Sequence, residues 1–145
     1  MNYDDTLSEW NKHPPSNLVD DLLHALTIEN NAIEQYTKLA DIAPNKIIQD
    51  QILLIKGAET IHYRHFSHFY TQMTGEIYTP QIPLDISTSY TESLHDAFKE
   101  KQNTVTFYYD LAERSNNPYV KEKFRRAAVD EQNHAVWLLY FLNHS

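Results

Sequence analysis

The chain has 145 residues, the size of one domain, and its scarcity of glycine favours helix. It contains no cysteine, which excludes disulfides, thiolate metal sites and catalytic thiols. The net charge of −8 disfavours binding to nucleic acid, because phosphate backbones would be repelled. The first residues lack the apolar run of a signal peptide, and no stretch approaches the ~18 apolar residues of a membrane span. We therefore expect a cytoplasmic protein with no membrane partner.

The first predicted element is a short leader, residues 1–15, and the remaining residues 16–145 are expected to form one domain. A first helix follows the leader, with Asn17 as its cap, and ends near Ala43 because Pro44 disfavours helix in the residue before it. Its inward positions recur at the three- and four-residue spacing of a bundle helix. These positions are Leu22, Ala25, Leu26, Glu29, Ala32, Ile33, Tyr36, Leu39 and Ala40.

Three more helices are predicted along the rest of the chain. They run from after Asn45 to about Met73, from Tyr90 or Thr91 to about Ser115, and from Pro118 nearly to the C-terminus. Asn45 and Asn117 are the expected N-caps, and Gly75 is expected to end the second helix. Pro118 suits the first position of the last helix, because an N–H at that position has no hydrogen-bond partner within the helix.

The second half of the chain repeats the first at an offset of 72 residues without a gap. The repeat pairs Tyr36 with Tyr108, Asn45 with Asn117, Glu59 with Glu131, and His62 with His134. Short connections make each half an antiparallel hairpin. The linker from Glu76 to Ser89, at roughly 3.3 Å per extended residue, is long enough to run back along the molecule. The prediction is an all-α antiparallel four-helix bundle, made of two helical hairpins joined by one long crossover.

Each half carries a Glu-x-x-His motif on its second helix, Glu59 with His62 and Glu131 with His134. Residues three apart share one helical face, so both side chains of a motif can reach one metal ion. Carboxylate and imidazole together suit iron, manganese or zinc.

Two further observations bear on these motifs. A third Glu-x-x-His, Glu92 with His95, fails the register test because Leu94 between them lies on the inward stripe. Glu29 does lie on the inward stripe, where a carboxylate is costly to bury unless it is paired or bound to metal. A hydrogen bond from Tyr108 or a histidine is the alternative partner for Glu29.

Over roughly residues 17–143, these residues resemble the rubrerythrin-type di-iron carboxylate bundles of the ferritin-like superfamily, without a rubredoxin domain. Members bind two irons or two manganese ions, and act on peroxide or dioxygen, oxidise ferrous iron or hydroxylate substrates. The resemblance therefore implies a metal-binding oxidoreductase. The implied metal ligands are Glu29, Glu59, His62, Glu131 and His134. It also implies that Tyr36 and Tyr108 orient the carboxylates.

The chain departs from this family at Lys101, which the repeat aligns with Glu29. Glu100 is adjacent but points ~100° away around the helix. Three carboxylates and one ammonium leave a charge of −2, which one divalent ion would balance; two protonated histidines would balance it without metal. The sequence therefore favours one iron or manganese ion over two. It leaves open a metal-free bundle with a structural or interaction role.

Spare aromatic side chains indicate contacts between helices or between subunits. They are Tyr63, Tyr109, Tyr119 and Trp137. A homodimer is the resulting prediction, whereas the sequence identifies neither a substrate nor a redox partner.

Overall fold

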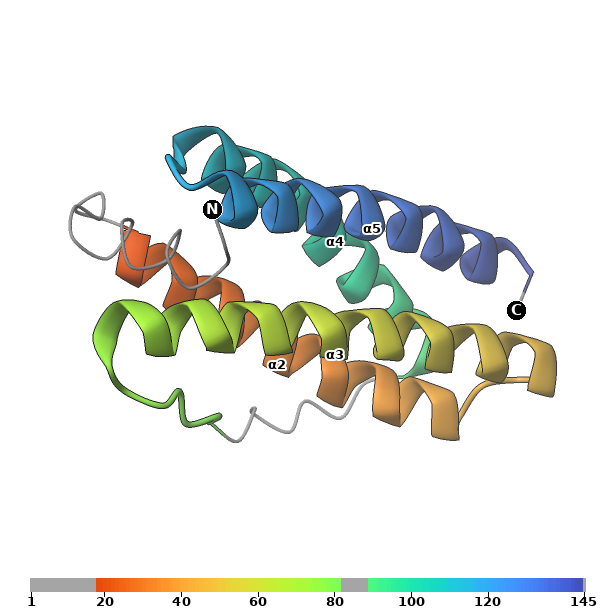
Figure 1. Ribbon diagram of the computed structural model, residues 1–145. Helices are drawn as coiled ribbons and strands as arrows, with labels where there is room; N and C mark the ends of the chain where they lie inside the picture. The colour runs from red at the N-terminus through yellow and green to blue at the C-terminus, as the bar shows by residue number, and fades with distance from the viewer. Residues whose placement is uncertain (1–17, 82–88, 145) are drawn as a thin grey trace.

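The computed structural model describes residues 18–81 and 89–144, in which four helices form a bundle (Figure 1). They are α2 (Leu18–Asp41), α3 (Lys46–Thr74), α4 (Tyr90–Arg114) and α5 (Pro118–Asn143). The four predicted helices and the all-α class are thus confirmed. The predicted leader and its neighbour Asn17 lie outside the described residues. None of the described helices combines the length and the apolar character that a membrane span requires.

The predicted caps are present in the structure. The Asn45 side-chain oxygen accepts a hydrogen bond from the Ile48 N–H at 2.9 Å, and Asn117 accepts one from the Val120 N–H at 3.1 Å. Gly75 ends α3 with a φ of 74°, a left-handed conformation that favours glycine. Each of these helix ends depends on one residue and its near neighbours in the chain. The ends could therefore be predicted from the sequence.

The predicted end of the first helix was two residues too late. The helix α2 ends at Asp41, and the Ile42 N–H donates to the Leu39 carbonyl at 3.3 Å in a tight final turn. Ala43 lies before Pro44, whose ring disfavours helical conformation in the preceding residue. The helix therefore ends two residues before Ala43, the residue that precedes the proline.

One position of the predicted inward stripe was also wrong. Ile33 is only partly buried, whereas Ile28 is 6% exposed. Because α2 contacts both α3 and α4, its buried face is wide enough to include Ile28. The rest of the predicted stripe is buried.

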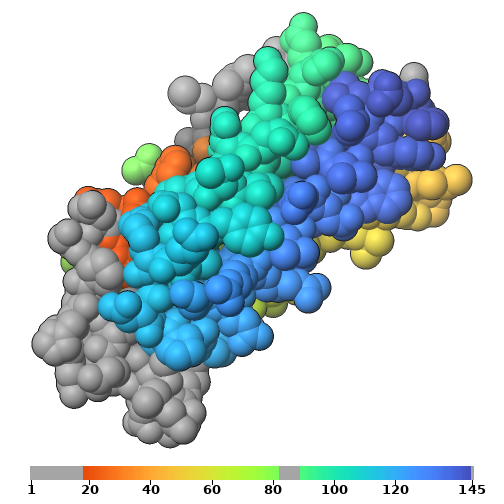
Figure 2. Space-filling model, turned by 90° about the horizontal axis from the view of Figure 1, so that it is seen from above, coloured from red at the N-terminus to blue at the C-terminus, as the bar shows by residue number. Residues whose placement is uncertain are grey.

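The helices pack as two antiparallel hairpins, α2 with α3 and α4 with α5. The helix α3 ends at one end of the bundle and α4 begins at the other (Figure 1), so the chain crosses the length of the molecule between them. The side-chain amide of Asn30 donates to the Gln81 carbonyl at 3.0 Å, which holds this connection beside α2. Figure 2 shows α4 and α5 side by side along the molecule. The predicted ferritin-like arrangement is therefore confirmed.

A polar layer divides the core into two apolar clusters. Along every helix the polar residues fall between the residues of one cluster and those of the other. Phe66, Phe69 and Phe124 are the large members of one cluster, and Ile52 and Phe141 belong to the other. The polar layer consists of Glu29, Glu59, His62, Lys101, Glu131 and His134, and none of these is more than 5% exposed. Six ionisable side chains in a dry interior need partners within the layer.

Candidate metal centre

All four helices contribute to the polar layer. The helices α3 and α5 each contribute the Glu and His of one motif, because residues three apart share a helical face. Glu29 comes from α2 and Lys101 from α4. Glu92 and His95, rejected on their register, are both exposed. The predicted inward positions therefore meet at one level of the bundle.

Four of the five predicted ligands form one compact group. Glu29, Glu59, His62 and Glu131 offer ligand atoms that all lie within 4.8 Å of one another. The Nδ1 atom of His62 lies 3.3 Å from Glu131 Oε1, 3.5 Å from Glu29 Oε1 and 4.0 Å from Glu59 Oε2. One ring nitrogen thus faces oxygens of three carboxylates.

The fifth predicted ligand, His134, lies outside that group. Its Nδ1 atom is 2.7 Å from Glu59 Oε1 and 3.5 Å from Glu131 Oε1. Lys101 is in contact with the same two carboxylates, since its Nζ lies 3.3 Å from Glu59 Oε2 and forms an ion pair with Glu131. The layer therefore has two halves that share Glu59 and Glu131. We call them the carboxylate half, with Glu29 and His62, and the ammonium half, with Lys101 and His134.

Glu100 does not replace the missing carboxylate. Its side chain is exposed, whereas Lys101 beside it is 1% exposed. The register of α4 thus turns the ammonium inward and the carboxylate outward. The inward position equivalent to Glu29 is occupied by a cation.

The two tyrosines differ in their partners. The Tyr108 hydroxyl donates to Glu29 Oε1 at 2.6 Å, a contact that fixes the carboxylate orientation. The Tyr36 hydroxyl has no hydrogen-bond partner among the described residues. The repeat aligns Tyr36 with Tyr108 and Lys101 with Glu29, so Lys101 stands where the acceptor for Tyr36 would be. An ammonium cannot accept a hydrogen bond. The Lys101 Nζ instead lies 5.5 Å from the centre of the Tyr36 ring.

Sequence reasoning missed Asp130. Its Oδ2 lies 2.8 Å from His62 Nε2, and its Oδ1 accepts from Arg126 at 3.1 Å. A carboxylate behind an imidazole fixes the orientation of the ring and makes its other nitrogen a better ligand. The equivalent residue in the first half is Ala58, so the repeat supplies no matching carboxylate for His134. This mismatch beside a motif glutamate is the signal that could have revealed Asp130.

The rubrerythrin family model matches residues 92–144, which contain most of α4 and all of α5. The uncharacterized protein YhjR of Bacillus subtilis is 42% identical over 125 residues, which make up 86% of this chain and 86% of that protein. The chain is a rubrerythrin-type, ferritin-like bundle. A solved structure of a hypothetical protein from Pyrococcus furiosus matches with a TM-score of 0.76 at 21% identity, over 91% of this chain and 92% of that chain. The latter likeness shows the shared fold.

In the ammonium half of this rubrerythrin-type site, Lys101 stays protonated. Burial alone would lower the pKa of Lys101, but the charges of Glu131 and Glu59 outweigh burial and raise it well above its usual value. Burial would likewise raise the pKa of Glu131, yet Lys101 and the two histidines hold it well below its usual range. Lys101 and Glu131 are therefore a charged pair inside the bundle.

The carboxylate half holds a proton that a metal ion could replace. Burial opposes the protonation of His62, but the hydrogen bond with Asp130 and the nearby carboxylates of Glu131 and Glu29 outweigh it and raise its pKa to about 11. Burial, Glu131 and Glu29 also raise the pKa of Glu59 well above its usual value. A metal ligand must be deprotonated, so metal and proton compete for this half of the layer.

The carboxylate half fits one divalent ion. Buried polar atoms normally have hydrogen-bond partners. Glu29 Oε2, His62 Nδ1 and Glu131 Oε1 have none among the described residues, and Glu59 Oε2 has only the Lys101 ammonium at 3.3 Å. Three oxygens and one imidazole nitrogen suit iron or manganese. The ammonium half does not fit a second ion, because the Lys101 ammonium already contacts both shared carboxylates.

Proposed function

We propose that this rubrerythrin-type bundle binds one iron or manganese ion in the carboxylate half, through Glu29, Glu59, His62 and Glu131. The observation that carries the proposal is the contact of the Lys101 ammonium with both Glu59 and Glu131. There it supplies the positive charge that a second ion would supply. Three carboxylates and one ammonium sum to −2, which a single divalent ion neutralises.

We further propose a non-haem oxidoreductase role toward peroxide, dioxygen or ferrous iron. The bound ion would supply one-electron redox chemistry. Tyr108 would hold Glu29 in place through its 2.6 Å hydrogen bond, and Asp130 would hold His62 through its 2.8 Å contact. The apolar clusters on both sides would exclude water, which strengthens every charge interaction inside the layer.

A metal-free bundle with a structural or interaction role is the second candidate. It is favoured by the contacts of His62 and His134 with the carboxylates, since two protonated histidines and Lys101 would neutralise three carboxylates. In that case the layer needs no metal for charge balance. Chelators would then leave the melting temperature unchanged.

The metal content after anaerobic loading with Fe(II) or Mn(II) tests the proposal. We expect one ion per chain by elemental analysis. His62→Ala and His134→Ala are a matched pair, because the repeat makes the two residues equivalent and both are buried. We expect His62→Ala to lose the ion and His134→Ala to retain it.

Each other outcome has a clear meaning. Two ions in the wild-type protein would show that Lys101 does not replace a cation. Equal loss in both variants would contradict the assignment to the carboxylate half. No ion in the wild-type protein would leave the metal-free bundle as the better account.

The homodimer, the cytoplasmic location and the absence of nucleic-acid binding stay predictions. Sedimentation velocity of the purified chain would test the first of them.

A further inference from the structure

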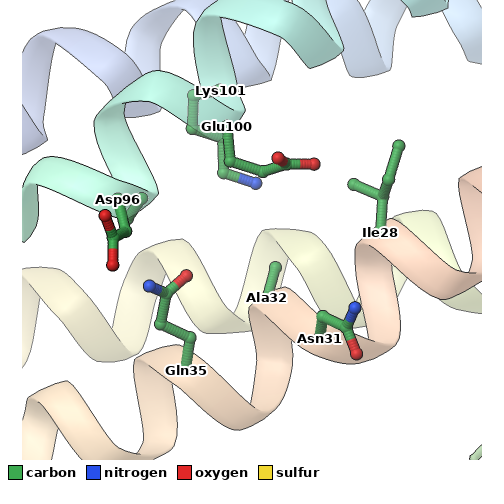
Figure 3. A pocket seen from close by; sticks show the side chains of 8 residues that line it. Ile28, Asn31, Ala32, Gln35, Asp96, Glu100 and Lys101 are labelled. Atoms are coloured by element: carbon green, nitrogen blue, oxygen red, sulfur yellow. The ribbon is translucent and has the colours of Figure 1, made fainter. Parts of the chain in front are cut away.

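A pocket of 240 Å³ lies between α2 and α4, and Lys101 of the polar layer is part of its lining (Figure 3). Exposed Asp96 and Glu100 line it on α4, and Gln35 and Ile28 line it on α2. Lys101, which is 1% exposed, forms its inner end. Because the Lys101 Nζ contacts Glu59 and Glu131, Lys101 connects the pocket lining with the metal centre.

The repeat explains why the pocket is open. Gln35 corresponds to Phe107 in the second half, and the Phe107 ring packs edge-on against His24, with 4.9 Å between ring centres. In the second half, the Phe107 ring thus fills the space that is equivalent to the space left open beside Gln35 in the first half. The Gln35 amide donates to the Ser93 carbonyl at 3.2 Å, which holds it against the first turn of α4. Its carbonyl oxygen remains as an acceptor, and Figure 3 shows it on the side facing α4.

The groups that line the outer part of the pocket attract cations. Asp96 and Glu100 lie one helical turn apart, and neither forms an ion pair with another described residue. Two carboxylates and an amide carbonyl are the oxygen ligands that divalent cations prefer. These groups make the outer part of the pocket attractive to a cation.

We propose that this pocket is the entry route for the divalent ion of the carboxylate half, an inference that rests on the proposed function. Lys101 is the barrier on this route. Its long, flexible side chain can turn outward to Asp96 or Glu100 while the ion takes its place beside Glu131. The ammonium then exchanges one carboxylate partner for another, so no buried charge is left unpaired during the passage.

The rate of Co(II) uptake, followed by stopped-flow absorbance with the full chain, tests the route. Gln35→Phe copies the residue of the second half and fills the pocket; it should slow uptake by about tenfold or more, because a close-packed interior excludes ions. Glu100→Gln should slow uptake roughly two- to fivefold at low ionic strength, and the difference should vanish in high salt. Glu113→Gln is the matched control, since Glu113 is an exposed residue of α4 outside the pocket. All variants should still bind one ion at equilibrium.

The outcomes separate this inference from the proposed function. One bound ion with the same uptake rate in all variants would overturn the route and leave the proposed function intact. No bound ion in the wild-type protein would overturn both. Circular dichroism checks the fold of Gln35→Phe, and if that variant is unfolded, the salt-dependent effect of Glu100→Gln against Glu113→Gln decides.

Discussion

Replacing Lys101 by glutamate should convert the proposed one-ion centre into a two-ion centre. Lys101 is the repeat equivalent of Glu29 and already contacts Glu59 and Glu131. With neutral histidines, three carboxylates and one ammonium give −2, whereas four carboxylates give −4. Two divalent ions neutralise the latter charge, and His134 would then face the second ion.

The same substitution should make stability depend on metal. Without metal, Lys101→Glu removes the cation from two carboxylates that are 0% exposed, and breaking such a buried pair costs about 3–5 kcal/mol. For a domain of this size the melting temperature should fall by roughly 6–20 °C. Mn(II) at a thousand times its dissociation constant should restore about 4 kcal/mol for each ion bound.

Elemental analysis and thermal melts with and without Mn(II) are the assays. Lys99→Glu is the matched control, because Lys99 lies on the exposed face of α4 and the change in charge is identical. The control should keep one ion per chain and a melting temperature near that of the wild-type protein. If Lys101→Glu bound one ion or none at saturation, the assignment of Lys101 as a substitute for the second ion would be refuted.

Four further predictions concern the histidine ligand, one helix cap and the core. Asp130→Asn should weaken metal binding about 10–100-fold by freeing the His62 ring, and isothermal titration would measure the loss. Because the pKa of His62 is raised to about 11, the metal-free protein is protonated there at neutral pH. Metal affinity should therefore increase with pH up to that value, with about one proton released per ion; a flat pH profile would argue against it. Asn45→Ala should cost about 1 kcal/mol of unfolding free energy, and Phe124→Ala, at a 0% exposed site, about 3–5 kcal/mol, both from urea denaturation. A cost below 1 kcal/mol for Phe124→Ala would contradict the packing of its cluster.

Much of the fold and of the centre is encoded in local sequence patterns. A cap depends on one side chain and the N–H groups two or three residues later, as at Asn45, so it can be found from the sequence alone. The inward position of Glu29 and Lys101 follows from helical spacing, because side chains three or four residues apart share a face. The internal repeat then aligned Lys101 with Glu29 and revealed the departure from a two-ion centre.

The tertiary structure alone decided how the two halves of the polar layer differ. The contact of His62 with Asp130 joins residues 68 positions apart, and helical spacing within either helix says nothing about such a pair. Periodicity also could not separate His134 from the other predicted ligands, because the repeat treats His62 and His134 alike. Which carboxylates meet Lys101, and which meet His62, depends on the packing of α4 against α5 and α2 against α3. The number of ions that we propose follows from that packing, since the packing decides which carboxylates the Lys101 ammonium contacts.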